Sequence, residues 1–410
     1  MVSALTRIFG LDNLALAEDV VQDAFCRALE IWKLRGMPDN PSAWLMKTAK
    51  NRAIDVLRRE RNARAILPEL RPALESEWTL VPTVNQFFAA DAIKDDQLRM
   101  MFSCCDQRLA EQAQVALILH LLCGFTVGEI ASAFLTGHAA VEKRFSRAKK
   151  VLASSKRLFD LADRDFAKRL SAVQRALYLL FNEGYHSASA ESVVRVELCR
   201  EAMRLGRILA EHPLTSTPAT EALCALMWLH AARLPARLDA AGYLKSFFDQ
   251  DRSKWDANLV SQGEQFLERS ARGGDLTEYH VEAAIAWVHA TAHRAEDTDW
   301  AKIVKLYDTL MSVRPSPVVA LNRAIAVAQS EGPKRGLEEM GKIADRERLA
   351  RYPFYSAALG ELELRSGRNE IARAHFREAL ALARNPIERR YLEQRAAACE
   401  NRSLHAELTG

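Results

Sequence analysis

The sequence predicts an all-α protein: two small helical domains, the second with a helix-turn-helix, followed by an α-solenoid of helix pairs. Glycine and proline are scarce, at 17 and 13 of 410 residues, whereas alanine and leucine, which favour helices, are abundant. Apolar residues recur at helical spacing, and the pattern breaks where glycine or proline occurs. An apolar fraction of 49% in 410 residues provides for sizeable cores, and the length predicts about two to four domains.

The charge balance excludes a chain that is basic throughout, because 57 basic residues are offset by 53 acidic ones, a net charge of +4. A nucleic-acid partner would have to be recognised by local basic clusters. The seven cysteines form no Cys-x-x-Cys pair, which predicts free thiols in a reducing cytoplasm. No stretch has the roughly eighteen apolar residues of a membrane span, and MVSALTRIFG lacks a signal-peptide pattern. The sequence therefore predicts a cytoplasmic protein without a membrane partner.

The first predicted domain covers residues 1–64 and begins with a helix over residues 14–34. Its predicted apolar stripe contains Val20, Val21, Ala24, Phe25, Ala28 and Leu29, and its polar face contains Glu18, Asp19, Gln22, Asp23, Arg27 and Glu30. That polar face suits a protein partner as well as water. The segment GMPDNPS (36–42) breaks the helix, and a second helix, with Ser42 as its predicted N-cap, runs to about residue 64.

The second helix of this domain carries a basic cluster. Between residues 47 and 64 there are seven basic residues and two acidic ones, and Trp32 and Trp44 lie just upstream. Positive charge beside aromatic rings suits single-stranded or unstacked nucleic acid. Burial of Trp44 in the core is the alternative, and its neighbours Leu45 and Thr48 favour that alternative.

Residues 65–95 contain three prolines without clear periodicity, which predicts a linker. The second domain, 96–157, ends in FTVGEIASAFLTGHAAVEKRFSRAKK (125–150). Thr126 and Glu129 have the spacing of a capping box at the start of a helix. Gly137, which is able to adopt a positive φ, follows that helix in a tight connection.

The next helix is expected to begin near Ala139 and to turn basic. Its predicted buried stripe contains Val141, Phe145, Ala148 and Leu152. Between residues 141 and 157 there are seven basic residues and one acidic residue. Together the two helices predict helix-turn-helix geometry, in which the second helix enters a DNA major groove. A solvated charged face is the alternative that the stretch alone leaves open.

The third predicted domain covers residues 167–410. It is predicted to be continuously helical from about residue 167 to 400, in segments broken near Gly184, 212–218, 273–274, 315–317, 332–333 and Gly367. Within residues 353–386, Gly360, Ala372 and Phe376 lie close to the spacing of a tetratricopeptide repeat (TPR). Small residues let two helices approach, and the phenylalanine fills the gap between them. The segment is therefore expected to be a TPR-like α-solenoid, and such solenoids bind a protein or peptide along a concave face.

Two polar groups in this region are candidate ligand sites. His289 and His293 lie four residues apart, a zinc-binding spacing, but no glutamate lies between them as in His-Glu-x-x-His, so a surface or core role is favoured. The segments FNEGYHSAS (181–189) and DQDRSKWD (249–256) could line a ligand pocket, or could cap helices and bridge repeats. No glycine-rich phosphate loop or Ser-His-Asp pattern stands out. The sequence therefore predicts no catalytic residue, metal or cofactor, and no enzyme.

Three segments carry a resemblance to a known family. AEDVVQDAFCRALEIW followed by PSAWLMKTAKNRAIDVLRRER resembles the sigma-2 domain of bacterial extracytoplasmic-function (ECF) RNA polymerase sigma factors. FTVGEIASAFLTGHAAVEKRFSRAKKVL resembles their sigma-4 domain. ALYLLFNEGYHSAS, DQDRSKWD and SPVVALNRAIAVA are similar to a subgroup with a long TPR-like C-terminal extension. The resemblance covers essentially the whole chain.

This resemblance implies a protein that binds core RNA polymerase (β′ clamp and β flap) and promoter DNA, with a C-terminal domain that regulates activity. The implied polymerase-binding residues are Asp19, Gln22, Asp23 and Arg27. The implied −10 DNA-binding residues are Asn40, Trp44, Lys47, Lys50, Asn51, Arg52, Arg58, Arg59 and Arg61. The implied −35 DNA-binding residues are His138, Ala140, Lys143, Arg144 and Arg147.

Two features depart from the family pattern. Sigma factors of this kind usually have more N-terminal helix before the segment that begins here at Met1, and Ala139 and Ala140 occupy positions where polar residues are common. The alternative function is a DNA-binding helix-turn-helix scaffold that holds protein partners on its solenoid without polymerase. Only a sigma factor needs both the helix at 14–34 and the strand-opening segment at 36–52, and both are present.

Overall fold

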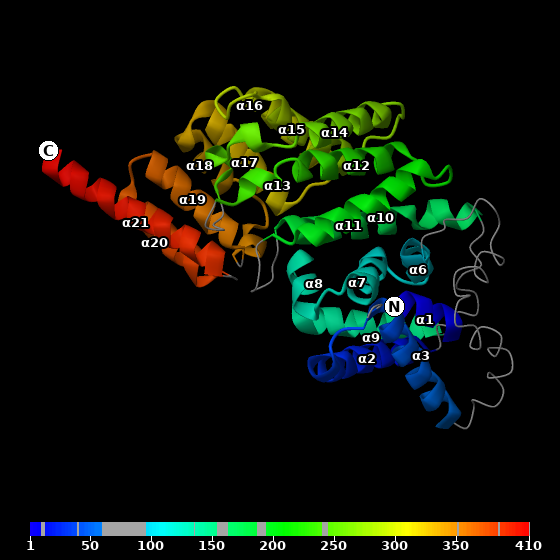
Figure 1. The fold of residues 1–410 in the computed structure, drawn as a ribbon. Helices are drawn as coiled ribbons and strands as arrows, with labels where there is room; N and C mark the ends of the chain where they lie inside the picture. The colour runs from blue at the N-terminus through cyan, green and yellow to red at the C-terminus, as the bar shows by residue number, and fades with distance from the viewer. Residues whose placement is uncertain are drawn as a thin grey trace. The chain divides into compact units, whose positions relative to one another are not determined.

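The computed structural model describes residues 1–9, 13–38, 41–59, 96–134, 136–153, 163–186, 194–239, 245–350, 352–383 and 386–409. Within these ranges the fold is helical without β-strands, which confirms the predicted all-α class (Figure 1). None of the described helices is long and apolar enough to cross a membrane. The chain divides into two compact units, Met1–Ala176 and Leu177–Gly410. The predicted linker at 65–95 lies outside the described residues.

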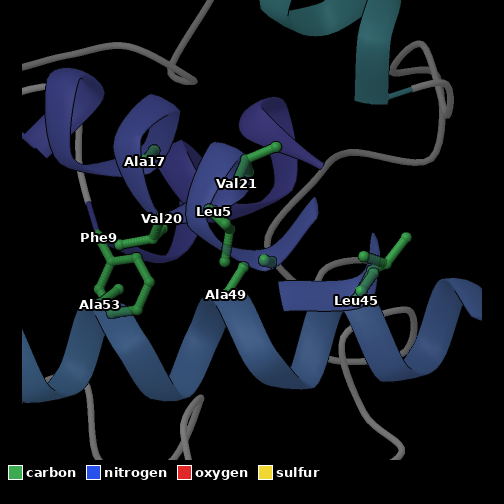
Figure 2. Close-up of a cluster of buried hydrophobic side chains, with 10 residues drawn as sticks. Leu5, Phe9, Ala17, Val20, Val21, Leu45, Ala49 and Ala53 are labelled. Atoms are coloured by element: carbon green, nitrogen blue, oxygen red, sulfur yellow. The ribbon is translucent and has the colours of Figure 1, made fainter. Parts of the chain in front are cut away.

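The first unit begins with a three-helix core. It is formed by α1 (Val2–Phe9), α2 (Leu14–Arg35) and α3 (Pro41–Arg59). Leu5 of α1 and Val20 of α2 are buried with Ala49 and Ala53 of α3 in one cluster (Figure 2). The two alanines lack bulky side chains, so α2 and α3 can approach closely. This core holds the outward faces of α2 and α3 in a fixed relationship.

A second group of helices follows in the same unit. It contains α6 (Asp96–Cys104), α7 (Glu111–Cys123), α8 (Val127–Ala133) and α9 (His138–Ala153), and α10 (Asp163–Tyr185) begins beyond it. The centre of α7 is buried on all sides, from Val115 to Leu119. Gly124 ends α7 in the left-handed region at φ 73°, which glycine adopts without steric cost. The helices α8 and α9 both pack on α7.

The start of α10 belongs to this first unit. The ring of Phe166 meets Phe102 of α6 edge to face, with centroids 4.9 Å apart. Arg169 Nη1 donates a hydrogen bond of 3.0 Å to the Phe102 carbonyl. The boundary between the two units then falls within α10, after Ala176.

The second unit is a succession of helices in which consecutive members pack together. They are α11 (Val196–Glu211), α12 (Pro218–Ala231), α13 (Leu234–Arg237), η2 (Phe247–Asp249), η3 (Arg252–Lys254), α14 (Ala257–Ser270), α15 (Glu278–Thr291), α16 (Trp300–Val313), α17 (Pro317–Glu331), α18 (Pro333–Gly341), η4 (Arg346–Leu349), α19 (Pro353–Arg365), α20 (Asn369–Ala381) and α21 (Pro386–Thr409). Helices end at or beside each predicted break, so glycine and proline divide this region there as expected. Three further interruptions were not predicted: those between α12 and α14, between α15 and α16, and between α18 and α19.

The helix pair expected in residues 353–386 is formed by α19 and α20. Gly360 of α19 lies so close to α20 that an added Cβ would be 3.1 Å from the Ala372 carbonyl oxygen and from the Phe376 ring. Phe376 is only 1% exposed, so its ring fills the space beside the glycine. Gly367 makes the connection between the helices at φ 78°. Close helix approach over a small residue is therefore observed here.

Two local predictions are wrong. Phe25 and Leu29 were placed in the buried stripe of α2 but are 49% and 75% exposed, because the core formed with α1 and α3 covers a narrower arc of α2. Ser42 was predicted as an N-cap but lies inside α3, which begins at Pro41. Gly137, which is able to adopt a positive φ, does not do so, and the connection before α9 needs no left-handed residue there.

Candidate polymerase and nucleic-acid interface

The exposed face of α2 contains all four residues that the resemblance assigns to polymerase binding. Asp19, Gln22, Asp23 and Arg27 are each exposed. They are held outward because Ala17, Val20, Val21, Ala24 and Ala28 turn into the core on the opposite side of the helix. The charges on this face are mixed, so it suits a partner with mixed charges rather than nucleic acid.

Sequence reasoning missed the apolar part of this face. Phe25 and Leu29, four residues apart, present exposed side chains beside Gln22. An exposed phenylalanine and leucine on one helix face are typical of a surface that a protein partner covers. A signal was present in the sequence, because an apolar stripe that includes positions 20, 21, 24, 25, 28 and 29 is wider than one helix-packing interface requires.

The outward face of α3 contributes Lys47 and Asn51, which lie four residues apart and are both exposed. Lys50 is half-buried on the flank. The helix is held by Leu45, Ala49 and Ala53, which face the core. A lysine and an amide side chain on one helical face can bind phosphate and hydrogen-bond an exposed base edge.

Trp44 is half-buried and packs against the core of α1–α3. Its ring meets Trp32 of α2 edge to face, with centroids 5.5 Å apart and planes at 62°. An aromatic pair of this geometry contributes about 0.5–1.5 kcal/mol beyond the area it buries. Trp44 therefore positions the start of α3 against the end of α2.

Arg52 faces away from Lys47 and Asn51, toward α2. Its Nε donates a 3.1 Å hydrogen bond to Asp23 Oδ2, and both side chains remain largely exposed, at 42% and 57%. The structure thus joins a residue assigned to DNA with one assigned to polymerase. Of the remaining −10 residues, Asn40 and Arg61 lie outside the described residues, and the side chains of Arg58 and Arg59 are not among those described.

The helix-turn-helix begins with the predicted capping box. Thr126 Oγ1 accepts a 3.2 Å hydrogen bond from the Glu129 backbone N–H, and Glu129 Oε2 accepts one of 2.7 Å from the Thr126 N–H. These bonds satisfy two backbone donors at the start of α8, which confirms the prediction.

The inward face of α9 matches the predicted stripe where the structure describes it. Val141 and Ala148 are fully buried, and Phe145 is 7% exposed. The Phe145 ring stacks on His120 of α7 with centroids 4.7 Å apart, and His120 Nδ1 is held 2.8 Å from the Phe125 carbonyl. The helix is therefore fixed on its buried side.

The opposite face of α9 presents His138, Ala140, Lys143 and Arg147, which are all exposed. Arg144 is half-buried, and its Nη1 has no hydrogen-bond partner in the described structure. The His138 ring lies over Gly128 of α8, where an added Cβ would be 3.2 Å from Nε2. The exposed basic side chains are thus presented on a helix that is braced by a second one.

The far end of α9 is also secured. Arg108 Nη2 donates 3.1 Å to the Val151 carbonyl, one of the last carbonyls of the helix. Asp106 holds this guanidinium through bonds of 2.9 Å to Nε and 2.7 Å to Nη2. The bond to Asp106 also raises the pKa of Arg108. A cation at a helix C-terminus is favourable because of the helix dipole.

The described ranges contain no group of three or more potential metal-binding side chains. His289 of the weighed histidine pair packs between the rings of Phe247 and Trp300, and His293 is exposed. Burial raises the pKa of the Cys104 thiol to about 12, so this thiol stays protonated.

Two segments of the chain match known family models. Residues 1–63 match the family model described as Sigma-70 region 2, and residues 169–271 match a family of unknown function, DUF6596. An uncharacterized protein of Rhizobium meliloti (strain 1021) is 38% identical over 394 residues, which is 95% of this chain and 91% of that protein. No solved structure matches the chain. The chain therefore belongs to the same family as the Rhizobium meliloti protein, and its sigma-70 region 2 supports a sigma-70 family sigma factor.

Proposed function

We propose that this protein is a sigma factor of the ECF type, which binds core RNA polymerase and directs it to specific promoters. The observation that carries the proposal is the pair α2 and α3, within the segment that matches sigma-70 region 2. One of these helices exposes a mixed charged and apolar face, and the other exposes a lysine and an asparagine. A protein-binding face and a DNA-binding face on one rigid core suit a factor that places DNA against polymerase.

In this proposal the α2 face binds the polymerase clamp. Phe25 and Leu29 supply apolar area, since removing apolar surface from water stabilises a complex by about 25 cal/mol per Å². The surrounding charged side chains, Asp19, Asp23 and Arg27, make the contact specific for its partner, because charged pairs at an interface chiefly set specificity and association rate.

The α3 face binds the −10 element of the promoter as its two strands separate. Unstacking one base costs a few kcal/mol. Contacts of Lys47 and Lys50 with phosphates, and of Asn51 with an exposed base, would offset that cost. No covalent chemistry is required, so binding free energy alone opens the duplex.

The exposed face of α9 reads the −35 element in the major groove. Lys143 and Arg147 contact phosphates or guanine edges, and Ala140 can touch a thymine methyl group. The capping box of α8 and the ring stack of Phe145 hold α9 at a fixed angle for this purpose.

The second unit regulates this activity as a TPR-like domain. The support is the close packing of α19 on α20 over Gly360, which is the packing that a tetratricopeptide pair requires. A truncation after residue 176, which keeps the first compact unit, tests this part. Promoter-driven transcription should change in amount; an unchanged output would remove the regulatory role while leaving the sigma factor in place.

Polymerase binding is the direct test of the proposed function. The full chain and purified bacterial core polymerase should coelute in gel filtration. The variant Leu29→Lys should weaken that binding, because it places a charge in the apolar part of the α2 face. Leu276→Lys is the matched control, since Leu276 is also exposed, at 53%, but lies in the second unit. Failure of the wild-type protein to bind core polymerase would overturn the proposal.

A further inference from the structure

Three arginines and a set of aromatic rings meet inside the second unit. Arg233 directly precedes α13 and Arg237 ends it, whereas Arg252 begins η3 and Trp255 directly follows it. Tyr185 comes from the end of α10. Backbone hydrogen bonds fix these segments together: the Lys245 N–H donates 2.9 Å to the Arg237 carbonyl, and the Asp256 N–H donates 2.9 Å to the Ala232 carbonyl.

The guanidinium groups stack on the rings. Arg237 Cζ lies 3.9 Å from the centroid of Tyr185, and Arg233 Cζ lies 4.4 Å from that of Phe247. Trp255 is shared, with Arg233 at 5.3 Å and Arg252 at 5.1 Å. Cation–π contacts of this kind hold a guanidinium in place without neutralising its charge.

Among the described residues, no carboxylate forms an ion pair with any of the three arginines. Arg252 instead donates to the carbonyls of His289 at 2.8 Å and Ala292 at 2.7 Å, and Arg233 reaches only Gln250 Oε1, at 3.3 Å. Asp297 acts on Arg252 only as a nearby charge. Arg237 is buried, and Arg233 and Arg252 are half-buried. A cation removed from water is ordinarily paired, because an unpaired buried charge is costly.

The pKa shifts of groups in the cluster are consistent with its excess positive charge. Burial lowers the pKa of Arg233, and the positive charges of Arg237 and Arg252 lower it further, although Tyr185 acts in the opposite direction. Burial, with the neighbouring arginines, lowers the pKa values of His230 and His289 to about 3. Both histidines are therefore neutral at pH 7, and the excess positive charge resides on the arginines.

Several buried polar atoms of the same cluster have no hydrogen-bond partner in the described structure. They are Tyr185 Oη, His230 Nδ1, Arg237 Nε, Arg252 Nε, Trp255 Nε1 and His289 Nδ1. Arg237 is 3% exposed and Trp255 is 8% exposed, so bulk water does not satisfy them. An orphaned buried donor costs about 1–3 kcal/mol, and native proteins rarely leave so many together.

We propose that this cluster, centred on Arg233, Arg237 and Trp255, is a binding site for a small oxyanion, a carboxylate or phosphate group. An oxyanion offers several acceptors and a negative charge, so it would satisfy the orphaned donors and offset the excess cation charge together. A cation would be repelled, and a neutral molecule would leave the charge uncompensated. His186, which is exposed and lies 3.1 Å from Arg237 Nη2 through its Nδ1, brings the cluster to the surface.

The proposed site uses residues of two sequence segments, FNEGYHSAS (181–189) and DQDRSKWD (249–256). Tyr185 and His186 from the first, and Arg252 and Trp255 from the second, join the cluster. Asp249 and Asp251 of the second segment instead bond to Ser246 at 2.5 Å and to Ser253 at 2.6 Å within their own turns. Ligand-binding and capping residues are thus interleaved along DQDRSKWD.

The test is thermal stability of the full chain in sodium phosphate and in sodium acetate, each compared with sodium chloride at equal ionic strength. We expect a saturable rise in melting temperature with one of the two probes. A response to phosphate identifies a phosphorylated ligand, and a response to acetate identifies a carboxylate ligand. If neither probe exceeds chloride, the donors are satisfied by water and the proposal is wrong.

Arg237→Gln should weaken the apparent affinity for the effective probe by about tenfold or more, since a hydrogen bond to a charged group is lost. Arg237→Lys, which keeps the charge but changes the donor geometry, distinguishes lost binding from failure to fold. Arg294→Gln removes the same charge from an exposed position of the same unit and should leave the affinity unchanged. An equal response in Arg237→Gln and wild type would place the anion elsewhere and overturn the proposal. Because the readout is binding, the result is independent of polymerase recognition.

Discussion

Arg52 on α3 donates a hydrogen bond from Nε to Asp23 Oδ2 on α2, at 3.1 Å, across the contact between the two helices. This bond links the face proposed for polymerase with the helix proposed for DNA. An exposed ion pair stabilises a fold by only about 0–1 kcal/mol, because water and salt screen it. The bond between Arg52 and Asp23 is therefore expected to contribute little to the stability of the fold.

The first prediction follows from that small contribution. Asp23→Asn should change the free energy of unfolding by less than about 1 kcal/mol and should weaken the affinity for core polymerase. Urea unfolding and polymerase binding, measured on the same variant, separate the two effects. A large loss of stability with unchanged polymerase affinity would show that the pair is structural.

The second prediction concerns the outer face of α9. Lys143→Ala and Arg147→Ala should each weaken binding of the polymerase complex to a duplex from this gene's own upstream region. Each lost phosphate contact should also reduce the slope of log affinity against log salt by about 1. Lys334→Ala removes one exposed lysine from α18 and should change neither quantity. Identical behaviour of all three variants would contradict the role of α9.

The third prediction concerns the capping box. Thr126→Ala leaves the Glu129 N–H without its side-chain acceptor and should destabilise α8 by about 1 kcal/mol. Hydrogen exchange of the amides at the start of α8 should accelerate, while α2 and α3 remain protected. Thr309→Ala provides the control, because Thr309 lies inside α16 and its hydroxyl donates to the Lys305 carbonyl rather than capping the start of a helix. Unchanged exchange at α8 in Thr126→Ala would mean that the capping box contributes nothing.

The fourth prediction compares two glycines of the second unit. Gly360→Ala forces a Cβ within 3.1 Å of the Ala372 carbonyl oxygen and the Phe376 ring, so α19 and α20 must separate. Such overpacking costs about 1–3 kcal/mol. Gly341→Ala meets nothing within 4 Å in α18 and should stabilise that helix by about 0.4–1 kcal/mol. Local hydrogen exchange should move in opposite directions in the two variants; a tolerated Gly360→Ala would contradict the close approach of the helices.

The fifth prediction is a pH dependence in the second unit. The pKa values of His230 and His289 are lowered to about 3 in the folded chain, whereas an unfolded histidine titrates near its ordinary value of 6.5. As the pH falls below about 6.5, the unfolded chain takes up protons that the folded chain does not, so stability is lost. The slope should approach 1.4 kcal/mol per pH unit for each histidine, at about one proton each.

Urea unfolding between pH 7 and pH 5, above the range of most carboxylates, measures this slope. His289→Gln should make it shallower, because one of the two titrating groups is removed. His375→Gln is the control, since His375 lies on α20 against Glu378 rather than in the aromatic cluster. A slope unaffected by His289→Gln would show that this histidine does not resist protonation in the folded chain.

The sequence predicts the features that depend on neighbours along the chain. The Thr126–Glu129 capping box and the burial of Val141, Phe145 and Ala148 all follow from spacing within one or two helical turns. The exposure of Phe25 and Leu29 was mispredicted because hydropathy does not say how much of a helix its neighbours cover. That information resides in the packing of α1 and α3 on α2.

The arginine and aromatic cluster of the second unit could be found only in part. Tyr185, Arg252 and Trp255 belong to polar segments that the sequence marks as candidate pocket linings. Arg233 and Arg237 follow an apolar helix without a recognisable motif. Their proximity to Tyr185 depends on contacts between positions about fifty residues apart, which no local spacing encodes.

Run-off transcription tests the central claim most directly. Purified core polymerase would be supplied with genomic fragments that include this gene's own upstream region, with and without the full chain. A sigma factor should produce discrete transcripts that require the added protein and that weaken with Lys143→Ala and Leu29→Lys but not with Lys334→Ala. The absence of protein-dependent transcripts from every fragment, together with no association with core polymerase, would contradict the account and leave a DNA-binding scaffold.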